Sequence, residues 1–417
     1  MLGGMLLLLS FVACTGADPK PEDTADTVDT VDTVDTGVTH ITDTDTVTDT
    51  GPDTDPVAEA AYAALYDPTV VQDVYLTVSA EGLAALAVDP GTFVSGSLRH
   101  GKVTLDDVGI RLRGEGTLDT KPSFRVKFTE FGGERYGTLE RLVLDGMDDD
   151  ATQVHAVLAH MAWRSAGLVG PSANFAKVWL NDAYVGLYAN IEVQDDRFAD
   201  RHWATDAGGD FWEAGDSADL TENGVQRFEL VAGDGDTQAL ANAEAILNGR
   251  DADFSEVAPT VMDVDQYLEF WAWSLVLGCD DGYPYETDEF NLYRLPSDGR
   301  YVWTNQALGN SFDTAIDWDR LRGNVGVQCL HDPECAAQLW DTVDGALTTW
   351  ESWDAHAMAD DLMILTDQAM TDDPSKPFST SEVDSARSRF LTRVDGLPGR
   401  VRTWMGTRPT TDGDSGP

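Results

Sequence analysis

Cations are scarce in this chain. Only 27 of its 417 residues are Lys or Arg, against 74 Asp or Glu, so the formal net charge is -47. A surface this acidic repels the phosphates of DNA and RNA, which excludes nucleic acid as a partner. The hydrophobic share of 42% and the 12 Trp residues still suffice for one large core or two moderate ones.

Long apolar runs are absent beyond the first residues, so no later segment is expected to span a bilayer. The opening sequence MLGGMLLLLSFVACTG combines an apolar run with small residues and a cysteine, and it resembles a bacterial lipoprotein signal peptide over residues 1–14, cleaved before Cys14. A lipid on Cys14 would anchor the exported protein to a membrane, in the periplasm or at the cell surface. No Lys or Arg precedes the run, and a buried hydrophobic helix is the alternative.

Cysteine is also scarce, with four in the chain. No CxxC pair and no spaced His pair accompanies them, which argues against a zinc site. If Cys14 carries a lipid, the short segment QCLHDPEC favours a local disulfide between Cys329 and Cys335, as expected in an oxidising compartment. Cys279 would then be unpaired.

Residues 15–57 lack any long apolar stretch and are dominated by Asp and Thr, with the near-repeat DTADTVDTVDTVDTG. This composition predicts a disordered acidic linker, extended by self-repulsion, that holds the folded part away from the membrane. A calcium-binding repeat is the alternative, but the glycines that turn such loops are missing. A disordered tail is also predicted at 407–417.

Strands and helices alternate without a clear break from about residue 70, which predicts one α+β domain over residues 58–406, with a small and a larger lobe. The hydrophobic periodicity predicts strands at 71–79, 109–113, 123–128, 139–145, 175–180, 183–192, 289–295 and 300–305, and helices at 149–167, 263–278 and 379–394. Asn181 and Asp182 mark a hairpin turn. Ser379 and Glu382 fit a capping box.

The few cations are clustered. Five of them fall in GIRLRGEGTLDTKPSFRVKF: Arg111, Arg113, Lys121, Arg125 and Lys127. The two halves of this segment alternate with period two, so the two basic residues of each half share a strand face. Neighbouring strands with such faces would form a platform for an anion, and phosphate is the leading candidate. The alternative is that these cations pair with some of the many carboxylates.

In this order, four segments resemble the bacterial and fungal CotH (spore-coat protein H) kinase-like proteins: VGIRLRGEGTLDTKPSFRVKF, FAKVWLNDAYVGLYANIEV, GCDDGYPYETDEFNLYRL and the spacing to SFD. QCLHDPEC is also similar to the cysteine-bearing segment of lipoproteins in this family. The resemblance covers about residues 72–405. It implies a divergent protein-kinase-like fold, with a small β-rich lobe and a larger, mainly helical lobe. It also implies phosphate transfer from ATP to Ser or Thr of exported or surface proteins.

The resemblance further implies ATP with Mg or Mn as cofactors, and roles for individual residues. The platform cations would bind the nucleotide phosphates, with Lys121 or Lys127 as the lysine ligand. Glu192, at the exit of the hairpin, would position that lysine. Asp281, released into a loop after the apolar helix, would be catalytic or metal-binding, with Asn291 as a metal neighbour.

The chain departs from the family's pattern in NQALGNSF, where Ala307 and Gly309 occupy positions at which the family has metal-binding aspartates. Asn305, Asn310 and Asp313 are the nearby substitutes. Losing a metal carboxylate removes several kcal/mol of transition-state stabilisation, so full activity is in doubt. Three functions therefore stay open: an atypical kinase with a rearranged metal site, a pseudokinase that binds a nucleotide, another anion or a partner, and a structural or adhesive surface protein.

Overall fold

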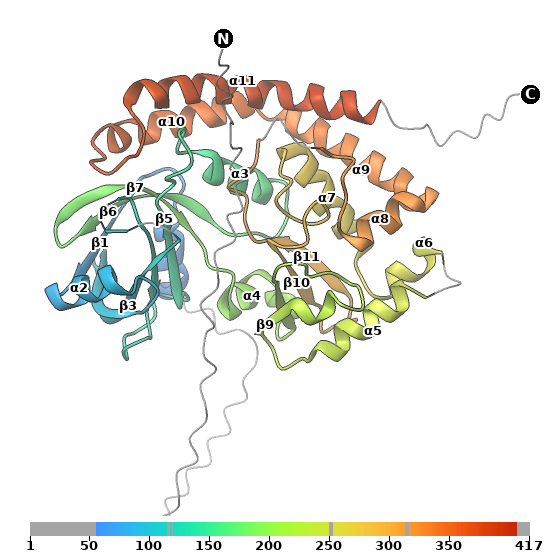
Figure 1. Cartoon of the computed structure of the whole chain (residues 1–417), viewed down its shortest axis with the longest axis horizontal. Helices are drawn as coiled ribbons and strands as arrows, with labels where there is room; N and C mark the ends of the chain where they lie inside the picture. Colours follow the sequence, from blue (N-terminus) through green and yellow to red (C-terminus); the bar gives the residue numbers. More distant parts are fainter. Residues whose placement is uncertain (1–55, 115–116, 119, 250–252, 313–316, 407–417) are drawn as a thin grey trace, which may run out of the picture. The chain divides into compact units, whose positions relative to one another are not determined.

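The computed structural model describes residues 56–406 except 115–116, 119, 250–252 and 313–316 (Figure 1). The predicted signal peptide with Cys14, the linker up to residue 55, Asp313 and the tail at 407–417 lie outside the described residues. Pro56 and Val57, predicted as the end of the linker, instead begin the first helix. Among the described helices, none combines the length and the apolar character needed to cross a membrane.

Seven strands form a closed barrel in the order β1-β2-β3-β4-β5-β7-β6. Their bounds are β1 (Gln72–Val78), β2 (Val94–His100), β3 (Val103–Arg113), β4 (Ser123–Lys127), β5 (Arg141–Asp145), β6 (Ala173–Leu180) and β7 (Ala183–Ile191). All neighbours are antiparallel except β1 and β6. Alternate residues of each strand fill the interior, including the fully buried Ile110, Val126 and Leu144.

The remaining strands form a four-stranded antiparallel sheet in the order β11-β10-β8-β9. They are β8 (Asp210–Ala214), β9 (Phe228–Ala232), β10 (Phe290–Arg294) and β11 (Tyr301–Asn305). The helices are α1 (Pro56–Leu65), α2 (Ala80–Val88), α3 (His155–Ser165), α4 (Asp196–His202), α5 (Thr237–Leu247), α6 (Phe254–Val257), α7 (Val264–Leu277), α8 (Asn324–His331), α9 (Pro333–Ser352), α10 (Ala355–Thr371) and α11 (Thr380–Met405). The described part is therefore α+β, as predicted.

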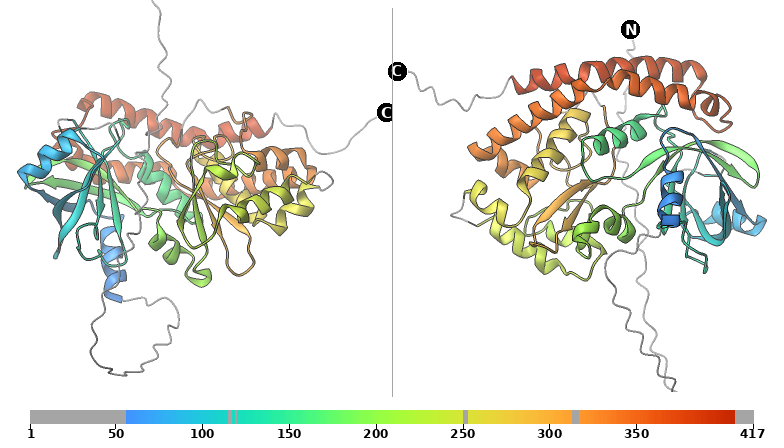
Figure 2. Two further views of the ribbon diagram at one scale, coloured as in Figure 1. Left: turned by 60° about the horizontal axis from the view of Figure 1, so that its bottom comes forward. Right: turned by 180° about the vertical axis from the view of Figure 1, so that it is seen from behind.

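Helix α7 is the centre of the larger hydrophobic core, because ten of its fourteen residues are buried. A helix that is apolar on all sides has no solvent face and must be surrounded by protein. It ends at Gly278, whose φ of 61° is the left-handed conformation that favours glycine. Helices α10 and α11 lie side by side along one edge of the described part in all views (Figure 2).

Several local predictions are confirmed. Asn181 and Asp182 both have positive φ and join β6 to β7 in a tight hairpin. The capping box of Ser379 and Glu382 begins α11. Cys329 and Cys335 form a disulfide, and Cys279 is free and buried. The paired cysteines lie in two successive helices, α8 and α9, rather than in a loop, because Asp332 caps the start of α9 between them.

Candidate functional site

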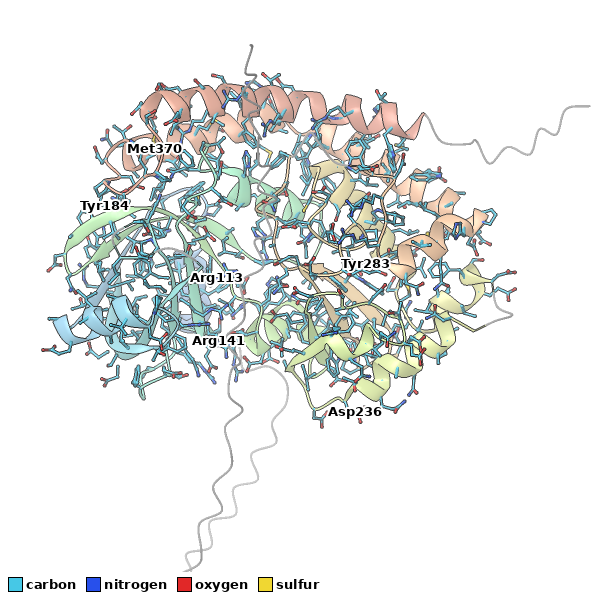
Figure 3. The ribbon with its side chains drawn as sticks, in the orientation of Figure 1. Arg113, Arg141, Tyr184, Asp236, Tyr283 and Met370 are labelled. Carbon is cyan, nitrogen blue, oxygen red and sulfur yellow. A yellow bond between two sulfur atoms is a disulfide. The ribbon has the colours of Figure 1, made fainter. Side chains whose placement is uncertain are left out.

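The basic residues of β3, β4 and β5 share the outer face of the barrel. Arg111 lies directly opposite Arg125, and Lys127 lies opposite Arg141. Residues between them in sequence point inward, so the alternation that fills the barrel also places the cations on one surface. We call this surface the basic face; it comprises Arg111, Arg113, Arg125, Lys127 and Arg141. Figure 3 shows Arg113 and Arg141 on these strands.

The cations of the basic face differ in how they are satisfied. Arg113 lies 3.7 Å from Asp145, and Lys127 lies 2.7 Å from Glu130, so ion pairing explains these two in part. Arg111 donates to the Gly91 carbonyl at 3.2 Å. The Nε atoms of Arg111 and Arg125 are buried and have no hydrogen-bond partner among the described residues. A bound anion would supply that partner.

Arg125 carries the clearest electrostatic signature of the basic face. Burial and the charges of Arg111, Arg113 and Arg141 together lower its pKa to about 10, while Glu213 opposes them. Arg125 remains charged at neutral pH. Like charges held this close repel, and an anion placed among them would relieve the repulsion.

The loop after α7 brings carboxylates toward this face. We call residues 279–289 the acidic loop. Tyr283 anchors it, since its buried hydroxyl donates to Asp219 at 3.0 Å and accepts from the Val325 amide at 2.8 Å. Asn310 donates to Asp281 at 2.7 Å, which fixes the carboxylate predicted to be catalytic. A tightly held loop of this kind can present a charged group in one orientation.

Two carboxyl groups of the acidic loop have unusual proton affinities. Burial and Asp288 raise the pKa of Asp281 to about 6, against the hydrogen bond from Asn310. Burial, Asp281 and Asp288 raise the pKa of Glu289 to about 7, while Arg113 acts in the opposite direction. Arg113 influences Glu289, and Glu213 influences Arg125, so these two carboxyl groups lie within electrostatic range of the basic face.

Replacing Glu289 with Gln is expected to stabilise the protein at pH 8. The folded-state pKa of about 7 lies above the ordinary value of 4.5, so the folded protein retains a proton that the unfolded chain releases, and stability falls as pH rises between these values. Removing the charge should raise the free energy of unfolding by about 1–3 kcal/mol at pH 8 and by about a quarter of that at pH 5. Urea unfolding at both pH values measures this. The exposed Glu229→Gln serves as control, and an equal gain at both pH values would contradict the assignment.

Lys121 does not belong to the basic face. Its ammonium is buried and lies 2.7 Å from Asp373, which follows α10 and is equally buried. Asp373 also accepts from the backbone amides of Leu187 and Ser375, at 3.0 and 2.8 Å. A Cβ on Gly186 would lie 2.6 Å from this carboxylate, which explains the glycine of the VGLY segment. The geometry gives Lys121 a structural partner rather than an open phosphate site.

Glu192 does not position a lysine, contrary to its predicted role. Its buried carboxylate forms an ion pair with Arg201 and lies 3.3 Å from the His202 ring. It also accepts from the Tyr62 hydroxyl at 2.9 Å and the Ser172 amide at 3.0 Å. The hairpin does deliver Glu192 to the end of β7, but α1 and α4, whose packing the sequence did not indicate, supply its partners.

Asn291 and Asp281 are the described members of the predicted metal set; Asp313 lies outside the described residues. Asn291 faces Glu213 across the β8–β10 pair and donates to Gln194 at 3.1 Å, and its buried Oδ1 has no partner among the described residues. No three His, Cys, Asp or Glu side chains in the described ranges are grouped to hold a metal ion.

The segment that lacks the aspartates lies beside Asp281, because Asn310, next to Gly309, donates to that carboxylate. The Ala307 amide donates to Asn305 Oδ1 at 3.0 Å. Gly309 is exposed, and a Cβ there would contact nothing within 4 Å. The backbone therefore has room for the carboxylate that this sequence lacks.

Four charged residues that act on the predicted site residues were not predicted from the sequence: Arg141, Glu213, Glu289 and Asp373. The period-two pattern of β5 could have identified Arg141, since it alternates with the buried Leu142 and Leu144. Glu213 and Asp373 have no local signal, because the cations they act on, Arg125 and Lys121, come from distant segments.

Comparison with known proteins gives one match that covers most of the folded part. The model of the CotH kinase protein family matches residues 110–370. No curated protein matches the chain. Among solved structures, the Helicobacter pylori proinflammatory kinase CtkA is 10% identical and has a TM-score of 0.30, with 68% of this chain and 95% of that chain covered. A chain of the Shewanella oneidensis MR-1 toxin–antitoxin complex of HipA, HipB and operator DNA is 10% identical and has a TM-score of 0.34, with 81% and 74% covered.

Both structural likenesses are too remote to support an argument. The family match is different, since it spans more than half of the sequence and includes the basic face and the acidic loop. The chain belongs to the CotH kinase protein family.

Proposed function

We propose that this protein binds the phosphates of ATP on its basic face and transfers phosphate inefficiently or not at all. The observation that carries the proposal is Arg125, a half-buried cation surrounded by other cations, with a buried Nε that lacks a partner among the described residues. The absence of carboxylates at Ala307 and Gly309 in the sequence supports the loss of efficient transfer.

A second candidate is an active kinase for Ser or Thr of exported or surface proteins. Asp281 favours it, because a carboxyl group with a pKa of about 6 can accept a proton from a hydroxyl near neutral pH. The two candidates share the basic face and differ only in turnover.

We further propose that the protein is exported and anchored through a lipid on Cys14. The disulfide between Cys329 and Cys335 supports this location, since such bonds persist in oxidising compartments. Its partners would then be exported or surface proteins.

Calorimetric titration with ATP tests the proposal. Wild-type protein is expected to bind ATP in EDTA as well as in Mg²⁺ or Mn²⁺. Arg125→Met should weaken binding by at least about tenfold through loss of charge-assisted hydrogen bonds, without destabilising the fold, because it removes like-charge repulsion. The exposed Arg389→Met is the matched control. Undiminished affinity in Arg125→Met would contradict the proposal.

Phosphate transfer separates the two candidates. With labelled ATP and Mn²⁺ or Mg²⁺, wild type and Asp281→Asn are expected to give the same background. Transfer that is present in wild type and lost in Asp281→Asn would select the kinase. The double variant Ala307→Asp and Gly309→Asp restores the family's carboxylates, and it is expected to gain metal-dependent transfer.

A further inference from the structure

A groove runs between α10 and α11, on elements different from those of the candidate site. The helices are antiparallel, since His356 near the start of α10 lies 3.0 Å from Asp395, far along α11. The groove between them has a volume of about 410 Å³. Two antiparallel helices leave a channel of this kind wherever no third element covers their shared surface.

Each helix contributes a strip with i, i+3, i+4, i+7 spacing. The strips are Asp360, Met363, Ile364 and Asp367 on α10, and Asp384, Arg387, Ser388 and Leu391 on α11. Seven residues of helix rise about 10 Å, so each strip spans two turns. A groove with two such facing strips matches the shape of a third helix.

One apolar side chain of this groove, Ile364, is open to solvent. Ile364 is 67% exposed, although it neighbours Met363 and Leu391 in the groove. A single exposed apolar side chain is common on a protein surface. One that lies in a groove between apolar neighbours would gain free energy from being covered.

Carboxylates form the rim on both sides. Asp360, Asp367 and Asp384 are exposed, and the Asp367 side chain retains 68% of its exposure. Arg387 is the cation among the lining residues, but its guanidinium turns inward. It donates to the Thr152 and Met363 carbonyls and to the Thr366 hydroxyl, and it lies 3.6 Å from Asp367.

These charges decide what the groove can accept. A second copy of this chain, placed groove to groove, would bring carboxylates against carboxylates. A segment with Lys or Arg beside its apolar stripe would pair with the rim on both sides. We propose that the groove docks an amphipathic, basic helix of a partner protein.

Docking at the groove does not depend on nucleotide binding. The groove shares no residue with the basic face or the acidic loop, so a failure of ATP binding leaves it intact. The groove would bind a basic partner, whereas the basic face would bind an anion.

Fluorescence anisotropy with a synthetic helix tests it. The probe is a labelled amphipathic helix of about 18 residues made of Leu and Lys, long enough for five turns. In buffer with about 0.15 M salt, where long-range attraction is screened, the full-length protein is expected to bind it. A scrambled peptide of the same composition should bind at least about tenfold more weakly, because it has no apolar stripe.

Matched variants locate the binding. Ile364→Gln, and separately Asp360→Asn combined with Asp384→Asn, should each weaken binding by at least about tenfold. All three positions are exposed, so thermal unfolding is expected to be unchanged. Ile246→Gln and the pair Glu222→Gln with Asp234→Asn are controls at exposed positions of the same kind, and they should bind normally. Absence of wild-type binding, full binding by either groove variant, or equal losses in the controls would overturn the proposal.

Discussion

Replacing Lys121 with Met is expected to lower the free energy of unfolding by about 3–5 kcal/mol, because the change leaves a buried carboxylate without its counter-ion. The side chains of Lys121 and Asp373 are 1% and 0% exposed. Burial lowers the pKa of Lys121 although Asp373 opposes the shift, so the ammonium depends on its partner to remain charged. Urea unfolding at pH 7.5 measures the loss.

Two further variants isolate the cause. Asp373→Asn added to Lys121→Met removes the orphaned charge and should recover most of the lost stability. Lys127→Met breaks a partly exposed pair with Glu130 and should cost no more than about 1 kcal/mol. A Lys121→Met protein as stable as wild type would show that the pair does not hold the loop before β4 to the α10–α11 connection.

The instability of Lys121→Met also affects how its ATP binding is interpreted. Loss of ATP binding in a Lys121 variant would resemble loss of a phosphate ligand, even where the fold itself had failed. The stable double variant distinguishes the two cases. We expect it to bind ATP as wild type does, whereas Arg125→Met does not.

Replacing Glu192 with Gln is expected to lower the free energy of unfolding by about 2–4 kcal/mol, because it removes the buried charge that pairs with the Arg201 guanidinium. Glu192 joins α1, the start of β6 and α4 through Tyr62, Ser172 and Arg201. Its side chain is 0% exposed, so solvent cannot replace these contacts. Adding Arg201→Met to Glu192→Gln should recover part of the loss.

The stability lost in Glu192→Gln should depend on pH in a defined direction. Burial alone would raise the pKa of Glu192, but the hydrogen bond and charge of His202, the charge of Arg201 and the Ser172 amide together lower it. The stabilisation of the fold by the ionised Glu192 is therefore complete above the ordinary Glu pKa of 4.5. It is lost as the pH falls through the lower pKa of the folded state. The gap between wild type and Glu192→Gln should narrow in acid. The exposed Glu81→Gln is the control, and a gap that widens in acid would contradict the assignment.

The elements with a strong local period were predictable from sequence. The cations of β3 and β4 alternate with apolar residues, and this alternation alone predicts that they share one strand face. The apolar run of α7 and the terminal Gly278 similarly specified a core helix and its end. Each of these signals depends on residues only a few positions apart.

The site was predictable only in part. Asp281 lies in the loop after the apolar helix, as predicted, because this loop follows directly from the end of α7. The resemblance predicted that Glu192 would position Lys121 or Lys127. Glu192 pairs instead with Arg201, Lys121 with Asp373 and Lys127 with Glu130. A charged side chain takes its partner from whatever packs beside it, and sequence spacing does not encode that choice.

By itself the sequence determined the family, the α+β class, the alternating cations of the barrel strands and the absence of aspartates at 307 and 309. Only the tertiary structure decided which cations are available to an anion. It buries Lys121 against Asp373, which is 252 residues away along the chain, and it leaves Arg125 among like charges. The reason is physical: alternation along a strand is a local property, whereas burial and counter-ions arise from contacts between segments that only the folded chain brings together.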